Sequence, residues 1–268
     1  MFAIAQWAKG DGGAPALAFA HEIFDVIDER WRPRDPHGRP EVLDRRWTPP
    51  SGPEPLTLDA SLHLLEACTV LAEVSPRPAV RAAVSGLVDL LGDRLVRHPC
   101  GTCADVFGPG WSDRPPTRHS VSYGHECERI SLILRAVGAI GDDPDPWVER
   151  FSPLAEHLAE VAHDRRRGGL WHSGPPCRPA WHRHKVWWVQ AEALYACDSL
   201  HRRRPAVLTG NLLDRTLAWV EDHQHDPVSG DWHAEVAGTI AVERPIAGPW
   251  KAPYHAGRAL LALTGATW

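Results

Sequence analysis

Three segments of the sequence hold more polar and aromatic residues than the start of a buried helix normally carries. They are residues 122–128 (SYGHECE), 185–193 (KVWWVQAEA) and 248–258 (GPWKAPYHAGR). Burying His, Glu, Gln, Lys or Arg costs free energy unless a ligand or a hydrogen-bonded network satisfies the side chain. The three segments therefore mark the part of the chain where chemistry is to be sought.

Pairs of functional residues in and near these segments stand about one helical turn apart. The pairs are His63 with Glu66, His125 with Glu128, and Trp188 with Glu192. Residues three or four positions apart share one face of a helix, so each pair would present its side chains together. Such pairs, converging from several helices, would build an active site. The alternative is an open helical solenoid in which they are satisfied polar groups of the core.

The elements that must position these residues are helices. Apolar residues recur at helical spacing in 57–74, 77–97, 123–140, 146–163, 186–201 and 205–222, and no run alternates as a strand. Long loops rich in Gly, Pro and Asp fall after every second helix, at 31–55, 99–119, 165–184 and 225–249. The sequence thus predicts a nearly all-α chain of helical hairpins whose long loops gather on one face.

A repeat supports this arrangement. His63, His125, Trp187 and His255 are separated by 62, 62 and 68 residues. Each interval holds a helix, a short turn, a second helix and a long loop, which is typical of hairpin repeats. If one helix of each hairpin lines the inside of a ring, the functional residues meet in a central pocket.

Composition indicates an ordinary globular protein of 268 residues, 43% of them hydrophobic, with a formal net charge of −5. Because no long polybasic run occurs, we expect no nucleic-acid partner. The apolar stretch at the N-terminus is too short for a signal peptide, and no segment is long and apolar enough to span a membrane. The expected protein is cytoplasmic, with one domain over residues 1–268.

The six cysteines lie at 68, 100, 103, 127, 177 and 197. Four of them lie in or beside apolar helical segments, where cysteine behaves as a small buried hydrophobe, so we expect no disulfide. Cys100 and Cys103 form a CxxC pair, but zinc and redox sites need partners that the sequence does not supply. No metal and no cofactor are expected.

The three polar segments resemble three blocks of the N-acylglucosamine 2-epimerase superfamily, most closely its cellobiose 2-epimerase branch. The blocks are S-Y-G-H-x-x-E, W-W-x-Q-A-E-A and G-P-W-K-x-P-Y-H-x-G-R, in this order, and residues 62–67 (LHLLEA) are similar to a fourth. The resemblance runs from residue 1 to 268 and implies an (α/α)6 toroid of six helical hairpins. Six units of roughly 64 residues would need about 384. The resemblance thus implies a toroid truncated at its N-terminal side to about four hairpins.

The activity implied is that of an isomerase, a sugar 2-epimerase that inverts C2 of an aldose of the mannose/glucose type or of an N-acylhexosamine unit. By resemblance, His125 and His255 are the two acid/base groups on either side of an enediolate. Histidine suits this task because it titrates near neutral pH, and such catalysis contributes roughly 10² to 10⁴ in rate.

Other residues of the pattern have supporting roles in this interpretation. Glu128 would orient the ring of His125, and His63 would hydrogen-bond the carbonyl or ring oxygen during ring opening. Glu66 is expected to act within the helix network. Arg258 would contact either the enediolate or a neighbouring carboxylate.

Sugar contacts are expected chiefly from tryptophan, because an indole face suits the apolar face of a sugar ring. Trp outnumbers Phe and Tyr together, 13 against 5 and 3. The candidates for contact with the sugar are Trp188, Trp250, Trp111, Tyr123, Glu192 and Asp59. Asp59 stands where the family usually has Asn, and Ser61 stands where it has a further His, so substrate preference could differ from that of the family.

Three other functions stay open at this point. The first is an aldose–ketose isomerase, which shares the enediolate but returns the proton to C1. The second is a metalloprotein in which the two HxxE pairs ligate a metal. The third is a non-catalytic sugar-binding relative that keeps its pocket or forms a homodimer through apolar flanks.

Overall fold

The computed structural model describes residues 1–31, 41–49, 54–115, 119–242 and 246–265. The chain forms two compact units. The first unit comprises Met1–Arg97, Cys103–His119 and Leu132–Pro144, and the second comprises His98–Thr102, Ser120–Ser131 and Asp145–Trp268. The single domain over 1–268 stays a prediction.

The first unit is built from helices that pair as hairpins. They are α1 (Phe2–Trp7), α2 (Gly13–Trp31), α3 (Leu58–Val74) and α4 (Pro78–Asp89), with π-helical turns at Ala8–Gly12 and Leu90–Arg94 and a 3₁₀ turn at Pro109–Trp111. Helix α1 packs against α2 and α3, and α3 packs against α4. The Thr57 side chain caps α3 by accepting from the Ala60 N–H, and Pro78 opens α4 at a position that needs no N–H.

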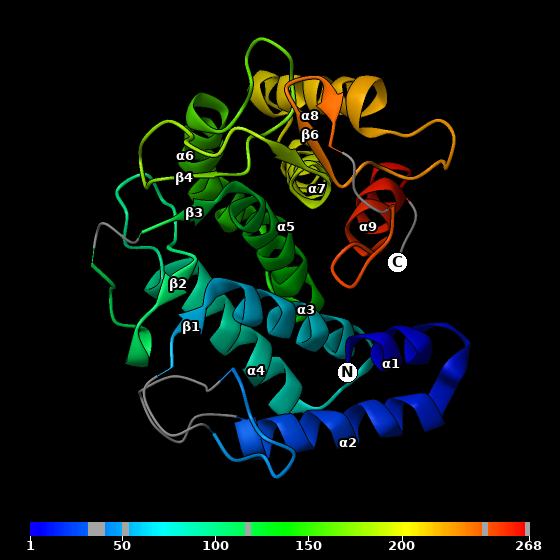
Figure 1. Ribbon diagram of the computed structural model, residues 1–268. Coiled ribbons are helices and arrows are strands. Elements are labelled where there is room, and N and C mark those ends of the chain that lie inside the picture. The colour runs from blue at the N-terminus through cyan, green and yellow to red at the C-terminus, as the bar shows by residue number, and fades with distance from the viewer. Residues whose placement is uncertain (32–40, 50–53, 116–118, 243–245, 266–268) are drawn as a thin grey trace. The chain divides into compact units, whose positions relative to one another are not determined.

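The second unit continues the same pattern. Its helices are α6 (Asp145–Val161), α7 (Trp187–Arg203), α8 (Val207–Trp219, extended by a π-helical turn at Val220–Gln224) and α9 (Tyr254–Leu263), together with the first half of α5 (Tyr123–Ala139). Helix α7 packs against its partner α8 and against α9, and α6 packs against α8 (Figure 1). The six helices predicted from hydrophobic periodicity are therefore confirmed.

Short strands fix the starts of three helices. Strands β1 (Leu56–Thr57), β3 (Val121–Ser122) and β5 (Lys185–Val186) directly precede α3, α5 and α7. Each pairs antiparallel with a strand of the long loop that follows the same hairpin: β2 (Val106–Phe107), β4 (Ser173–Gly174) and β6 (Glu235–Ala237), the last also pairing with β7 (Ile240–Ala241). The sequence predicted no strands, because two or three residues are too few to show alternation. These ladders bring each long loop back to a helix start.

The core of the second unit lies between α7, α8 and α9. Its buried members are Ala191, Leu194, Tyr195, Trp219, Val220, Trp232, Val236, Ala256 and Ala259. Burying a large apolar side chain contributes roughly 1.5–3 kcal/mol. This cluster therefore holds the starts of α7 and α9 in fixed positions.

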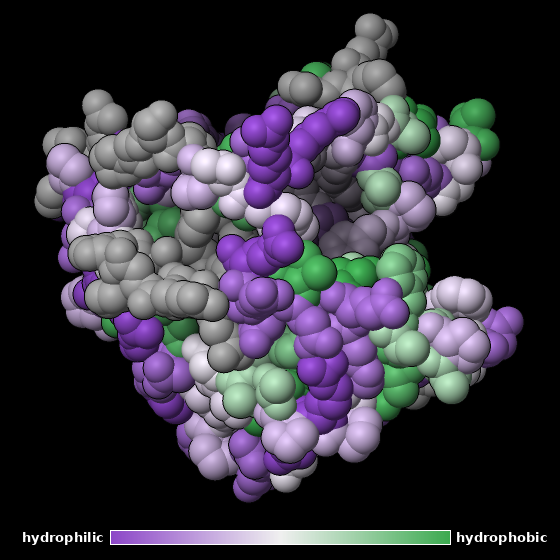
Figure 2. Space-filling model, turned by 90° about the horizontal axis from the view of Figure 1, so that it is seen from below, coloured by the Kyte–Doolittle hydropathy of each residue, from purple (hydrophilic) through white to green (hydrophobic). Residues whose placement is uncertain are grey.

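Hydrophilic and hydrophobic residues are interspersed on the face of the protein in Figure 2. Large apolar side chains are exposed on α1 and α2 of the first unit, where Trp7 is 51% and Phe19 50% exposed, and on α9 of the second, where Leu260 and Leu261 are 42% and 45% exposed. None of the helices in the described ranges is long and apolar enough to cross a bilayer.

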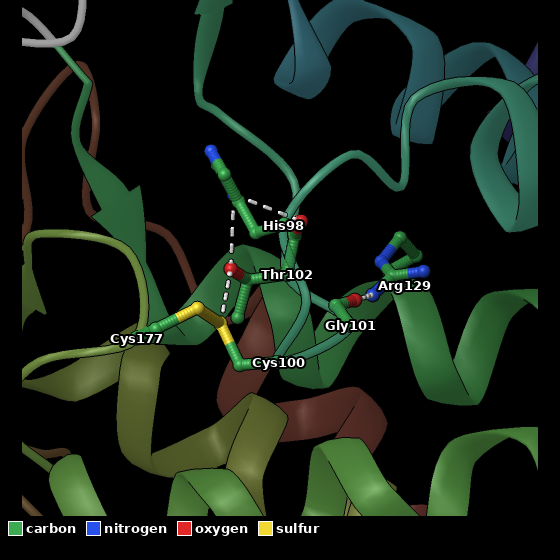
Figure 3. The surroundings of a disulfide bond; sticks show 6 residues. All are labelled: His98, Cys100, Gly101, Thr102, Arg129 and Cys177. Carbon is green, nitrogen blue, oxygen red and sulfur yellow. Dashed lines mark hydrogen bonds between the residues drawn. A yellow bond between two sulfur atoms is a disulfide. The ribbon is translucent and has the colours of Figure 1, made fainter.

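The cysteine prediction was wrong for one pair. Cys100 and Cys177 form a disulfide within the second unit, although 77 residues separate them (Figure 3). Both lie in loops, where no periodicity reveals which residues meet. The Thr102 hydroxyl lies 3.3 Å from Cys100 Sγ, and Gly101 O accepts from Arg129 Nη2 at 2.7 Å, which ties this turn to α5. The other four cysteines are free, as predicted: Cys68, Cys103 and Cys127 are buried and Cys197 is half-buried.

Candidate active site

The candidate site lies in the second unit, at the starts of α5, α7 and α9. His125 is the third residue of α5, and Trp188 and His255 are the second residues of α7 and α9. The Trp188 ring centroid is 5.0 Å from that of His125 and 5.7 Å from that of His255. The two histidines predicted to exchange protons with the substrate therefore both lie next to one indole.

A glycine allows the indole to approach α5. A Cβ atom on Gly124 would lie 2.3 Å from Trp188 Cζ3, far inside van der Waals contact. Any larger residue at 124 would displace the ring that touches both histidines. The glycine of the segment 122–128 is thus explained by the tryptophan of the segment 185–193.

His255 is held by a buried carboxylate. Its Nδ1 lies 2.6 Å from Glu192 Oε1, and Glu192 is 0% exposed. Burial alone raises the pKa of the Glu192 carboxyl, but the charge of Arg258 and the hydrogen bond of His255 outweigh it and hold the pKa below its usual value. An ionised carboxylate only accepts hydrogen bonds, so Nδ1 carries the proton. In the neutral ring this leaves Nε2 as the basic nitrogen.

Arg258 joins two carboxylates. Its Nη2 donates to Glu192 Oε1 at 2.5 Å and to Glu128 Oε1 at 3.1 Å, and its Nη1 donates to the Tyr254 hydroxyl at 2.6 Å. Arg258 is 3% exposed. Of the two roles predicted for Arg258, the carboxylate contact is therefore observed. Tyr254, which the sequence did not single out, completes this network.

One oxygen of the network has no partner within the described part of the chain. Glu192 Oε2 is buried and accepts no hydrogen bond there. A buried acceptor left unsatisfied costs about 1–3 kcal/mol. The network is therefore open toward a hydrogen-bond donor, such as a hydroxyl group of a ligand.

Among the described residues, three members of this network form a group that could hold a metal ion. Ligand atoms of Glu128, Glu192 and His255 lie within 4.8 Å of one another. This group differs from the two HxxE pairs considered from the sequence. Arg258 Nη2 contacts both carboxylates and supplies the positive charge that they require. The arrangement therefore favours proton transfer over metal ligation.

A second buried network starts from β5 and α7 and holds the loop that precedes them, through Asp164, Gly168 and Leu170. Lys185 Nζ donates to Asp164 Oδ2 at 3.0 Å and to Gly168 O at 2.5 Å. Gln190 accepts from Leu170 N at 2.7 Å and donates to Leu170 O at 2.8 Å. For these two residues of segment 185–193, a protein network satisfies the buried polar groups.

Three histidines that the sequence analysis missed form a cluster that reaches Trp188 through His172. The His172 ring lies 6.3 Å from Trp188 and stacks on His184 at 5.0 Å, with an interplanar angle of 19°. The Ser173 hydroxyl joins the cluster to His182 Nδ1 at 2.9 Å. The available signal was three histidines in one long loop, two of them in the run WHRH at 181–184.

Two predicted sugar contacts have contrasting environments in the second unit. Tyr123 is 1% exposed, and burial raises the pKa of its hydroxyl to about 12. A Cβ atom on Gly174 would lie 2.1 Å from this hydroxyl, so Tyr123 supports the β4 loop. Trp250, by contrast, is 90% exposed.

The remaining predicted residues lie in the first unit. On α3, His63 Nε2 is 3.3 Å from Asp59 Oδ1 and its Nδ1 is 4.0 Å from Glu66 Oε2. The Glu66 side chain is 4% exposed, whereas that of His63 is 43% exposed. Trp111 is 8% exposed and packs edge-on against Phe107, with centroids 5.5 Å apart. The helix face predicted for His63 and Glu66 is therefore present in the first unit.

Comparison with known proteins places the chain among sugar epimerases. The sequence profile of N-acylglucosamine 2-epimerase (GlcNAc 2-epimerase) matches residues 1–259. The chain is 24% identical to the cellobiose 2-epimerase of Bacteroides fragilis over 279 residues, covering 99% of this chain and 69% of that protein.

Solved structures give the same fold. The cellobiose 2-epimerase of Bacillus thermoamylovorans superposes with a TM-score of 0.89 at 22% identity, covering 98% of this chain and 69% of the other. A D-mannose isomerase superposes with a TM-score of 0.84 at 16% identity, covering 95% and 67%. These likenesses confirm the predicted toroid of helical hairpins. This chain spans about seven-tenths of the length of the related structures.

Proposed function

Because the chain belongs to the N-acylglucosamine 2-epimerase family, we propose that it is an isomerase that interconverts the C2 epimers of an aldose. The observation that carries the proposal is the pair of imidazoles, His125 and His255, beside the indole of Trp188. The substrate class is a small sugar of the mannose/glucose type or one with an N-acylhexosamine unit.

The proposed chemistry needs two opposed acid/base groups. In the open-chain aldose, C2–H lies next to the C1 carbonyl. His255 Nε2 removes this proton, and the electron pair of the C–H bond moves to give an enediolate at C1 and C2. His125, protonated, donates a proton to the opposite face of C2 and the carbonyl forms again. In the reverse direction the two histidines exchange roles.

The surrounding charges suit an enediolate. Glu192 fixes the proton of His255 on Nδ1, and Arg258 forms ion pairs with the carboxylates of Glu192 and Glu128, which offsets part of their negative charge. The starts of α5, α7 and α9 add the positive ends of three helix dipoles. Glu192 thus fixes which nitrogen of His255 carries the proton, and Arg258 and the helix dipoles favour a developing negative charge on the substrate.

The proposed sugar contacts combine an indole with polar side chains. Trp188 provides an apolar surface, and the open oxygen Glu192 Oε2 accepts from a sugar hydroxyl. We retain the other predicted residues as proposed contacts or supports: Asp59, His63, Glu66, Trp111, Tyr123 and Trp250. The cluster of His172, His182 and His184 adds ring nitrogens to this set.

The experiment is NMR product analysis with glucose, mannose, N-acetylmannosamine and cellobiose. A C2 epimer as the product supports the proposal and names the substrate. A ketose would instead assign the aldose–ketose isomerase, which uses the same enediolate. If the folded protein binds a sugar but forms no product, it is a non-catalytic relative, and gel filtration would then test the homodimer.

A further inference from the structure

A groove in the second unit lies between α6 and α8. Its volume is about 340 Å³. Its lining is formed by Ala159, Leu208 and Leu212 on the apolar side and by His163, Arg165, Asn211 and Arg215 on the polar side. None of these residues belongs to the candidate active site. The volume is in the range that small-molecule sites occupy.

One ring nitrogen of the histidine in this groove has no hydrogen-bond partner among the residues that the structure describes. His163 is 8% exposed, and its Nε2 bonds to no group among the residues that the structure describes. Burial lowers the pKa of the ring to about 4, with a further lowering from the charge of Arg215. His163 is therefore a buried neutral ring with one unsatisfied nitrogen. Such a group is rare in a folded protein unless something else satisfies it.

Within the described part of the chain, the two arginines of the groove also lack acidic partners. Arg215 Nη2 donates to Arg165 O at 2.7 Å, and no carboxylate in the described ranges forms an ion pair with either residue. By contrast, Arg202 and Arg258 pair with Asp198 and Glu192. The groove thus concentrates two unneutralised guanidinium groups in a chain whose formal net charge is −5.

We propose that this groove binds a small phosphorylated metabolite, with the phosphate between Arg165 and Arg215 and the carbon skeleton on the apolar wall. Guanidinium groups offer planar pairs of N–H donors that match phosphate oxygens. The Asn211 amide adds a donor. The His163 ring lies close enough to line the site and becomes a further donor once an anion favours its protonation.

The test is isothermal titration of the full chain with inorganic phosphate, mannose 6-phosphate and mannose. We expect saturable binding of both phosphates. Because hydrogen bonds to a charged group are strong, Arg215→Gln and Asn211→Asp should each weaken it by at least about tenfold. Arg166→Gln is the matched control, since Arg166 is exposed, adjacent and outside the groove, and it should change affinity by less than about twofold.

A second measurement follows the His163 ring by NMR, with its signal identified by loss in His163→Gln. Phosphate binding should raise the pKa of this ring from its value of about 4. The proposal is overturned if no binding saturates below about 10 mM. It is equally overturned if the Arg215 and Asn211 variants bind phosphate as tightly as the wild type does. An unchanged pKa of the His163 ring on addition of phosphate would also overturn it.

Discussion

Two buried ionic networks extend from the same nine-residue segment at the start of α7. In the first, Lys185 and Gln190 meet Asp164 and the backbone of the preceding loop, and the lysine and amide side chains are satisfied by the protein. In the second, Glu192 meets His255 and Arg258 but keeps one oxygen without a partner in the described ranges. The first network is closed and the second is open.

The difference separates a structural role from a chemical one. Buried charge is costly in both networks, and both carboxylates have pKa values held low by neighbouring cations despite burial. Burial and a shifted pKa therefore do not distinguish them. The distinguishing features are the unsatisfied acceptor and the histidine, 18% exposed, that the open network orients.

The largest expected effect comes from Glu192→Gln, which keeps the shape of the open network and removes its charge. Without an ionised acceptor, the proton of His255 is no longer fixed on Nδ1. Loss of such a tautomer control lowers turnover by roughly 10³ to 10⁴. The rate of C2 epimerisation, measured by NMR on protein whose melting temperature has been checked, tests this.

The control is Glu126→Gln. Glu126 is also fully buried, but its carboxylate pairs with Arg129 at 2.6 Å. This variant should lose stability while turnover per folded molecule stays within about tenfold. Equal losses of activity in both variants would remove the distinction between a carboxylate that orients a histidine and one that does not.

Disrupting the closed network should lower the stability of the folded protein. Lys185→Met leaves the Asp164 carboxylate buried without its cation and should lower the free energy of unfolding by about 3–5 kcal/mol. Lys251→Met is the matched comparison, because its partner Asp231 is 33% exposed, and it should cost only about 1 kcal/mol. Denaturant titration measures both. A Lys185 variant as stable as the Lys251 variant would mean that the closed network does not support the loop.

Low pH should lower the stability of the second unit, because His163, which precedes Asp164 in the sequence, is buried as a neutral ring. Its pKa of about 4 in the folded state lies below that of a free histidine, so the unfolded chain takes up the proton first. The stabilisation is present above about pH 6.5 and is lost as the pH falls toward 4, by up to about 3 kcal/mol. Unfolding titrations across this window should show a flatter profile for His163→Gln; parallel profiles would show that another group is responsible.

A smaller effect is expected from Gly124→Ala, which touches the open network only through Trp188. The added methyl group would overlap the indole and should cost about 1–3 kcal/mol, with turnover falling by more than the stability loss explains. Gly138→Ala on the same helix is the control, because a Cβ there meets nothing within 4 Å. If the two variants behave alike, the close approach of Trp188 to α5 has no functional meaning.

Helices and most site residues could be predicted because both leave local signals. Hydrophobic periodicity marked the helices, and the spacing of about one helical turn marked His125 with Glu128 and Trp188 with Glu192. All three segments picked out for burying too many polar groups contribute to one network, which contains Glu128, Glu192, His255 and Arg258. The sequence could not show which buried polar groups lack a hydrogen-bond partner in the described part of the chain, as Glu192 Oε2 does.

The contacts that the loops make could not be predicted, because they join residues far apart in the sequence and follow no periodic pattern. The disulfide joins Cys100 to Cys177, and the histidine cluster of residues 172–184 approaches Trp188 only after the loop pairs back at β4. Neither contact has a repeat that a sequence pattern could reveal. Tyr254 was passed over because its role depends on Arg258, one turn further along α9.

The most direct test of the two-histidine site is exchange of the C2 hydrogen in deuterated water, starting separately from each epimer, with cellobiose and its mannose-ended epimer as the first pair. Wild type, His125→Gln and His255→Gln are compared after a check of folding. The account predicts that each variant loses interconversion yet still exchanges the C2 hydrogen of one epimer, a different one for each variant, because a single base remains on one face. Exchange from both epimers at the wild-type rate in either variant would contradict it.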